Sequence, residues 1–126
     1  MKRYSSLNIL LIEDNPADVL LLQSALETDR LSQFNLTRVE RLAEGLQRLK
    51  QEPFDIALVD LGLPDSSGLE TFTKLHAQAP DLPVVVFSGN KDEEQAIQAV
   101  RAGAQDYLVK CVSGFEMAPR TIRYAV

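Results

Sequence analysis

The sequence predicts a doubly wound α/β domain: a five-stranded parallel sheet in the order 2-1-3-4-5, with helices on both faces. Continuous apolar runs alternate with amphipathic segments, which is typical of buried parallel strands covered by helices. The connections between them are short and are expected to be right-handed crossovers. Because the chain has 126 residues, 45% of them hydrophobic, we expect residues 1–126 to form one domain.

Five segments are the candidate strands. We place the most apolar of them, 7–12, 56–59 and 84–87, in the centre of the sheet, because strands buried on both faces are apolar runs. Segment 34–39 is more polar and segment 107–109 is short, so we place these two at the edges. In this order the chain reverses direction between the first and third strands. Binding sites in such sheets lie at this switch point, beyond the carboxyl ends of the strands.

Apolar residues at helical spacing predict a helix after each strand. Asn15 and Pro16 suit the N-cap and first turn of a helix that runs to about Asp29. The second helix follows from the spacing of three leucines. The inward residues of these helices are expected to be Val19, Leu22, Ala25 and Leu26 in the first and Leu42, Leu46 and Leu49 in the second.

The third and fourth helices are also marked by their ends. Residues 67–70 form a capping-box pattern for the third helix. Asn90 with Glu93 suits the start of the fourth helix, and Gly103 suits its end. The expected apolar faces are Phe72, Leu75 and Ala79 in the third helix and Ala96, Ile97 and Val100 in the fourth.

The start of the fifth helix is harder to place. Ser113 with Glu116 suits a cap, but Pro119 removes an amide donor inside the helix unless the regular part begins near Ala118. The expected inward residues are Phe115, Ala118 and Ile122.

Charge and cysteine content exclude several classes of protein. The 13 Lys and Arg residues against 18 Asp and Glu give a net charge of -5, which disfavours direct nucleic-acid binding. A single cysteine, Cys111, cannot form an internal disulfide and indicates a reduced, cytoplasmic environment. The first apolar run is interrupted at Glu13, too early for a signal peptide or membrane span.

Three acidic residues follow two neighbouring strands of the predicted sheet. Glu13 and Asp14 end the first strand and Asp60 ends the third, so the topology brings their carboxylates to one crevice. Crowded carboxylates call for a hard divalent cation, and oxygen ligands suit Mg²⁺. The alternative for Glu13 and Asp14 is helix capping and dipole compensation before Pro16, a role that is compatible with metal binding.

Three further features indicate phosphoryl chemistry. Asp60 ends a buried strand, where an ionised carboxylate can attack phosphorus. Ser88 ends the next central strand and can donate a hydrogen bond to a phosphoryl oxygen. Lys110 follows the last strand and supplies positive charge to the same crevice. Each has a simpler alternative: a turn-capping aspartate, a turn-forming serine and a solvated surface lysine.

Together these residues resemble the receiver domain of bacterial two-component response regulators, over essentially the whole chain. The resemblance implies the flavodoxin-like receiver fold. The matching motifs are Ile12-Glu13-Asp14-Asn15, Val59-Asp60 with Pro64, Ser88, Gly103-Ala104 before Asp106-Tyr107-Leu108, and Lys110.

The resemblance implies transfer of a phosphoryl group to Asp60 from the phosphohistidine of a sensor histidine kinase or a phosphotransfer protein, in the presence of Mg²⁺. The receiver then catalyses its own phosphorylation and dephosphorylation, although it acts primarily as a signalling switch. By the same resemblance Asp14 and Asp60 ligate the metal directly, Glu13 does so through water, and the backbone carbonyl of Gly62 completes the protein ligands. Lys110 pairs with the phosphoryl group.

The switch is expected to involve Ser88 and Tyr107. A phosphoryl group adds about 1.5 to 2 negative charges, so the Ser88 hydroxyl should move toward it. The resemblance implies that Tyr107 then turns inward and reshapes the face formed by the fourth helix, the fifth strand of the sheet and the fifth helix. An output domain, a downstream protein or a second copy would bind there. The alternative is that Tyr107 is an ordinary half-buried aromatic. Gly62 and Asn90 flank the crevice and are expected to tune phosphoryl lifetime.

The chain departs from the family after Lys110. Receivers usually have proline there with a cis peptide, whereas this chain has Cys111. A cis bond before a non-proline residue costs about 2.5 to 4 kcal/mol, so we expect this peptide to be trans. We interpret Cys111 as a small apolar filler rather than a redox-sensitive thiol, and His76 as a structural residue outside the site.

Two other functions remain open on the same fold. A pseudo-receiver would bind partners without phosphorylation, but the complete set of acidic, hydroxyl and lysine residues argues against it. An FMN carrier would bind at the same switch point, but segment 14–18 is acidic where a phosphate cradle needs free amides. Residues 122–126 resemble receivers that continue into an output domain, so we expect the last helix to continue rather than to end a stand-alone receiver.

Overall fold

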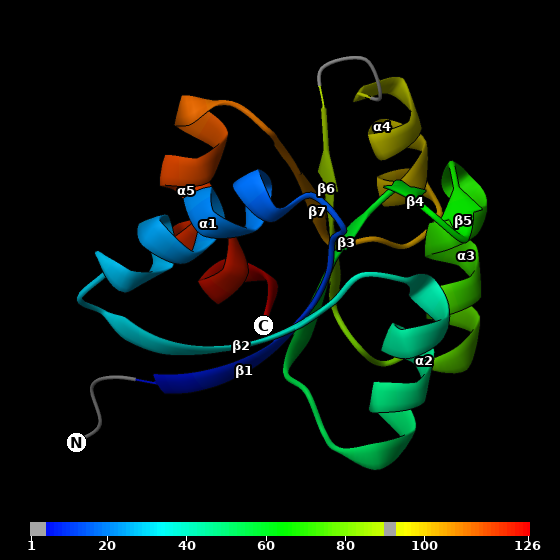
Figure 1. Ribbon diagram of the computed structural model, residues 1–126, viewed down its shortest axis with the longest axis horizontal. Coiled ribbons are helices and arrows are strands. Elements are labelled where there is room, and N and C mark those ends of the chain that lie inside the picture. The colour runs from blue at the N-terminus through cyan, green and yellow to red at the C-terminus, as the bar shows by residue number, and fades with distance from the viewer. Residues whose placement is uncertain (1–4, 90–92) are drawn as a thin grey trace.

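A computed structural model describes residues 5–89 and 93–126 of the chain. Five parallel strands form one sheet in the order β2-β1-β3-β6-β7. This is the expected 2-1-3-4-5 order, with the two less apolar strands at the edges (Figure 1). The strands are β1 (Ser5–Ile12), β2 (Ser32–Val39), β3 (Ile56–Asp60), β6 (Val84–Ser88) and β7 (Asp106–Val109).

Helices cover both faces of the sheet. Two of them pack on one face and three on the other, so the sheet lies between two helical layers (Figure 1). The first layer contains α1 (Pro16–Glu27) and α5 (Val112–Ala125); the second contains α2 (Leu42–Gln51), α3 (Leu69–Gln78) and α4 (Glu93–Arg101).

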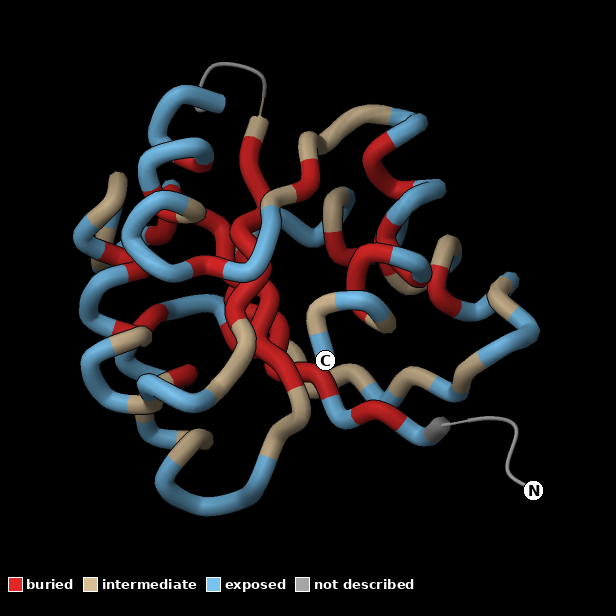
Figure 2. The backbone as a smooth tube through the Cα atoms, turned by 180° about the vertical axis from the view of Figure 1, so that it is seen from behind, coloured by how far each residue is buried: buried red, intermediate tan, exposed pale blue. Residues whose placement is uncertain are grey.

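The core is divided by the sheet into two clusters. Alternate residues of one strand face opposite layers, so Leu10 and Ile12 pack with α2, α3 and α4 while Ile9 and Leu11 pack with α1 and α5. Every residue of β3 and β6 is buried, and Figure 2 shows the buried backbone concentrated in the central strands. Because these strands are buried on both faces, they read as continuous apolar runs in the sequence.

The start of α1 confirms its expected cap. The Asn15 side-chain oxygen accepts from the amides of Ala17 at 2.9 Å and Asp18 at 3.4 Å, and Pro16 is the first helical residue. The helix ends at Glu27, slightly before the expected end.

The capping box predicted for α3 is wrong. Ser67 instead belongs to a small antiparallel hairpin, β4 (Gly62–Leu63) with β5 (Ser66–Ser67). Gly68 precedes the helix with a φ of 73°, where glycine is favoured, and its amide donates to the Leu61 carbonyl at 2.7 Å. The hairpin therefore takes the residue that the sequence pattern assigned to the cap.

The cap predicted for α5 is also wrong. The helix begins at Val112 after Cys111, with no side-chain cap, and Pro119 lies buried inside it. A proline there removes one amide donor, yet the helix continues to Ala125. Cys111 is partly exposed, and its sulfur lies 3.4 Å from the Ser113 hydroxyl, so it is not an apolar core filler.

The α3–α4 layer confirms other expectations. Gly103 follows α4 with a φ of 129°, as expected for a residue that ends a helix. His76 is partly exposed and stacks on Phe72 with ring centroids 5.2 Å apart, which fits a structural residue. Ile97 is 38% exposed, so α4 presents alanines rather than this residue to the core. The predicted Asn90 cap lies outside the described residues.

None of the helices described here is both long and apolar enough to cross a lipid bilayer.

Candidate functional site

Three carboxylates meet at the carboxyl ends of β1 and β3, as the sequence predicted. Glu13 and Asp14 directly follow β1, and Asp60 is the last residue of β3. The two strands are neighbours, with Ile12 paired to Val59. One carboxylate oxygen from each acid lies within 4.8 Å of the others. Glu13 is 0% exposed and Asp60 is 7% exposed, so two of the three charges are largely removed from water.

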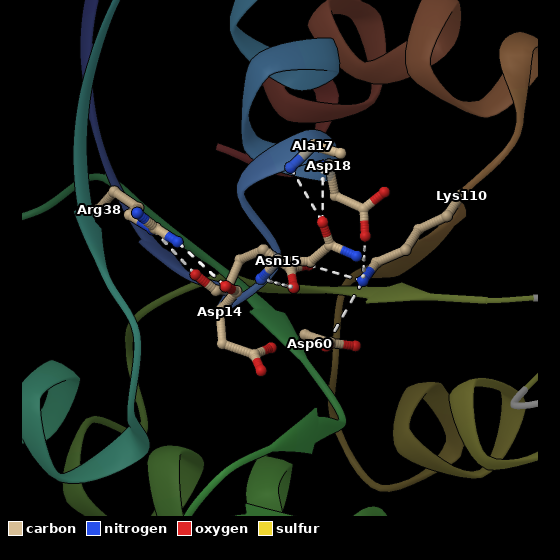
Figure 3. Close-up of polar contacts among 8 residues, drawn as sticks. Asp14, Asn15, Ala17, Asp18, Arg38, Asp60 and Lys110 are labelled. Atoms are coloured by element: carbon tan, nitrogen blue, oxygen red, sulfur yellow. Dashed lines mark hydrogen bonds and ion pairs between the residues drawn. The ribbon is translucent and has the colours of Figure 1, made fainter.

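Lys110 reaches this group from the end of β7. Its Nζ lies 2.7 Å from Glu13 Oε1, 2.9 Å from Asp18 Oδ2 and 3.4 Å from Asp60 Oδ2. Figure 3 shows Lys110 pointing between Asp18 and Asp60. The described residues contain no cis peptide bond, so the peptide to Cys111 is trans, as expected. The prediction that Lys110 enters the crevice is confirmed, and the contact with Asp18 was not foreseen.

The electrostatics of the crevice favour an added cation. Burial raises the pKa of Glu13 to about 7 against the opposing effect of Lys110. Burial also raises the pKa of Asp60, again opposed by Lys110. Burial would lower the pKa of Lys110, but hydrogen bonds to Glu13 and Asp18 outweigh it and raise that pKa. One ammonium therefore faces more carboxylates than it can neutralise.

The backbone around the acids is held by Arg38 of β2. Its Nε donates to the Glu13 carbonyl at 3.0 Å and its Nη2 to the Asp14 carbonyl at 3.2 Å (Figure 3). The Asn15 amide donates to Glu13 Oε2 at 3.1 Å. The sequence analysis missed Arg38, because its role depends on the register that pairs it with Leu11.

The loop after β3 is fixed by Asp65. Its two carboxylate oxygens accept from the amides of Leu42 at 2.9 Å and Ala43 at 3.0 Å, so a residue from another segment caps α2. Gly62, in the same loop, is exposed.

Ser88 and Tyr107 lie on neighbouring strands but in different surroundings. Ser88 ends β6, is 0% exposed, and its Oγ has no hydrogen-bond partner within the described part of the chain. Tyr107 is partly exposed, and its hydroxyl donates to Glu93 Oε2 of α4 at 3.1 Å. Ser88 is thus positioned to donate to a ligand, whereas Tyr107 points toward α4. Asn90, predicted beside them, falls in the segment that the structure does not describe.

Comparison with known proteins identifies the family. Residues 9–120 match the response regulator receiver domain. The chain belongs to this family, which is the receiver of two-component signalling. The KDP operon transcriptional regulatory protein KdpE of Escherichia coli is 39% identical over 103 residues, covering 82% of this chain and 44% of that protein. The chain spans about half the length of the curated relatives it matches.

Two solved structures support the same fold. The phosphorylated cyanobacterial phytochrome response regulator RcpA superposes with a TM-score of 0.79 at 25% identity, covering 95% of this chain and 94% of the other. The Mn²⁺-bound form of response regulator Rcp1 superposes with a TM-score of 0.74 at 28% identity, covering 90% of each chain.

The donor set of this receiver fits a divalent cation. Glu13, Asp14 and Asp60 offer oxygen ligands only, two of them are buried, and Lys110 leaves their charge in excess. Hard cations such as Mg²⁺ prefer ligands of this kind. Across the residues that the structure describes, these three form the only group of acidic, histidine or cysteine side chains close enough together to hold a metal.

Proposed function

We propose that this receiver accepts a phosphoryl group on Asp60 in the presence of Mg²⁺. The convergence of Glu13, Asp14 and Asp60 within 4.8 Å, with the Lys110 ammonium among them, carries the proposal. Asp60 is the last residue of β3, and its carboxylate lies 3.4 Å from the Lys110 Nζ. A carboxylate held in this way is a suitable oxygen nucleophile for phosphorus.

The donor would be a phosphohistidine of a sensor histidine kinase or a phosphotransfer protein. A carboxylate oxygen of Asp60 attacks the phosphorus, so that an O–P bond forms as the P–N bond breaks. The imidazole leaves with the electron pair of that bond and takes a proton from solvent. Lys110 and the buried Ser88 hydroxyl, which has no partner among the described residues, then donate hydrogen bonds to the phosphoryl oxygens. Hydrolysis by water returns Asp60 to the free carboxylate.

Four residues would hold the cation in this proposal. Asp14 and Asp60 would bind it directly, the Gly62 carbonyl would add a third protein ligand, and Glu13 would bind through water. When bound, Mg²⁺ offsets the negative charge that collects on the carboxylates and the phosphoryl group. Gly62 is exposed at the crevice, where it and Asn90 would influence the access of hydrolytic water.

Phosphorylation would then change the surface formed by α4, β7 and α5. The new charge, about 1.5 to 2 units, draws the Ser88 hydroxyl toward it. The movement of Ser88 makes room for the Tyr107 ring. The Tyr107 hydroxyl then leaves Glu93, and the ring turns inward. We propose that an output domain or a downstream protein reads this surface, and that two receivers can pair through it in the cytoplasm.

Incubation with acetyl phosphate and Mg²⁺ tests the proposal, with intact mass as the measurement. We expect one phosphate-sized adduct that is absent in EDTA and absent in Asp60→Asn. The matched control is Asp55→Asn, which removes an acid that bonds the Asn8 amide at the opposite end of the sheet; this variant should still be modified. If acetyl phosphate fails, a phosphorylated histidine kinase replaces it.

An adduct that persists in Asp60→Asn would contradict the assignment. No adduct from either donor would also contradict it and would favour a pseudo-receiver.

A further inference from the structure

Lys110 is held by an acid that does not belong to the candidate metal group. Asp18, in the first turn of α1, lies 2.9 Å from the Lys110 Nζ. The carboxylates that lie within 4.8 Å of one another are those of Glu13, Asp14 and Asp60. The Asp18 carboxylate therefore contacts the Lys110 ammonium but is not one of the carboxylates proposed to bind the cation.

The distances show where the ammonium is retained. An N–H···O hydrogen bond normally spans about 2.7–3.2 Å. The contacts with Glu13 at 2.7 Å and Asp18 at 2.9 Å fall inside this range, whereas the contact with Asp60 at 3.4 Å falls outside it. The ammonium has three donors, and it lies closer to Glu13 and Asp18 than to the phospho-acceptor Asp60.

Asp18 is itself fixed in place. It lies in the first turn of α1, whose N-cap Asn15 accepts from the Ala17 amide at 2.9 Å, and its side chain is only 18% exposed. The Lys110 side chain is 15% exposed. Two partly buried opposite charges at this distance attract each other more strongly than a solvated surface pair does. The contact is consequently strong enough to compete with another anion for the same ammonium.

We infer that Asp18 is a positioning residue that competes with the phosphoryl site for Lys110. Full engagement of Lys110 with a phosphoryl group on Asp60 weakens or breaks its contact with Asp18. Asp18 therefore lowers the affinity of the crevice for phosphoryl groups, and it acts through Lys110. This inference rests on the proposed function.

Beryllofluoride, a phosphoryl mimic, provides the first test in the presence of saturating Mg²⁺. Asp18→Asn keeps the size of the side chain and removes the competing charge, so we expect about threefold to tenfold tighter beryllofluoride binding, the equivalent of about one hydrogen bond. The matched control is Glu27→Gln, which removes one charge from the other end of α1 and should leave the affinity unchanged. Equal or weaker binding by Asp18→Asn would overturn the inference.

A double-mutant cycle separates an effect through Lys110 from a structural one. In a Lys110→Ala background, Asp18→Asn should change beryllofluoride affinity by less than about twofold, because the group it competes for is missing. A gain as large as in the native background would show that Asp18 acts through the general charge or through helix stability, and would overturn the inference.

The Lys110 ammonium can also be observed directly by NMR, without any phosphoryl chemistry. The ¹⁵Nζ resonance should shift in Asp18→Asn and stay unchanged in Glu27→Gln. An unchanged resonance in Asp18→Asn would overturn the inference. A wild-type protein that binds no beryllofluoride would contradict the proposed function instead, so the two failures are distinguishable.

Discussion

The side chains inside the crevice and the backbone that surrounds it are stabilised very differently. The surrounding backbone is well satisfied: Arg38 bonds two carbonyls after β1, and Asp65 accepts two amides of α2. Inside, Glu13 and Asp60 face each other across one ammonium, and the buried Ser88 hydroxyl has no partner within residues 5–89 and 93–126. We call this hydrogen-bonded backbone, held by Arg38 and Asp65, the frame; it surrounds crevice groups whose charges and hydrogen-bonding capacity are not fully satisfied.

The acids of the two regions show this contrast in their pKa values. Burial raises the pKa of Asp60, which means that its ionised form is disfavoured in the folded chain. For Asp65, slight burial is outweighed by hydrogen bonds from the amides of Ala43 and Leu42, which lower the pKa. The same residue type thus stabilises the frame and destabilises the crevice. A bound cation would offset the unfavourable free energy of keeping the buried Asp60 carboxylate ionised.

The largest expected effect on stability comes from Gly114, near the start of α5, which packs against the backbone just before Lys110. A side chain at Gly114 would clash with the backbone carbonyl oxygen of Val109, directly before Lys110. We expect Gly114→Ala to lower the free energy of unfolding by about 3 kcal/mol, as measured by urea unfolding.

Gly62→Ala is the matched control for that substitution, because a Cβ at Gly62 would meet no atom within 4 Å. We expect it to change stability by less than about 0.5 kcal/mol. Equal losses in the two variants would show that the start of α5 is not a tightly packed part of the frame.

Arg38→Ala should have the next largest effect. It removes two hydrogen bonds to the carbonyls of Glu13 and Asp14, so we expect a loss of about 1.5 to 2 kcal/mol in urea unfolding. Arg48→Ala, which breaks an exposed pair with Glu52, should cost less than about 0.5 kcal/mol. If both arginines cost equally little, the frame does not depend on the β2 contact.

Asp65→Ala tests the acid of the frame, and its effect should depend on pH. We expect a loss of about 1 kcal/mol at pH 7, because the cap of α2 is removed. The folded pKa of Asp65 lies below its ordinary value of 3.8. Its contribution is therefore complete well above pH 4 and disappears as the pH falls through the folded pKa.

Urea unfolding of the wild type and Asp65→Ala at pH 7 and pH 3 measures this difference. It should shrink in acid, and a difference that grows in acid would contradict the account.

Tyr107→Phe should have the smallest effect on stability. The hydroxyl bonds Glu93 at a solvent-exposed position, so its loss should change the free energy of unfolding by less than about 0.5 kcal/mol. A loss of 2 kcal/mol or more in urea unfolding would place Tyr107 in the frame rather than on a surface that is free to move.

The sequence predicts the parts of the receiver that follow from periodicity and strand ends. Buried runs identify β1, β3 and β6, and the topology alone brings Asp60 to Glu13 and Asp14. It does not predict contacts that depend on exact register or on loop shape. Arg38 looks like an ordinary polar residue of an edge strand, and Asp65 caps a helix that lies 22 to 23 residues earlier in the chain.

Local patterns fail where tertiary structure uses the same residues differently. Ser67 has the right spacing for a cap but is paired in a hairpin. Ser113 has the right spacing too, but α5 begins before it. Asp18 carries no sequence signal at all, because its importance comes from the position of Lys110 at the end of a distant strand.

Thermal unfolding of the wild type and Asp60→Asn, in EDTA and in Mg²⁺, tests most directly whether the crevice acids are kept for a ligand at the expense of stability. In EDTA at pH 7 the variant should unfold a few degrees higher, because a neutral side chain replaces an ionised carboxylate whose burial is unfavourable. In Mg²⁺ the wild type should gain stability by binding the cation and should overtake the variant. A wild type whose unfolding temperature does not change with Mg²⁺, or two proteins that shift equally, would contradict the account.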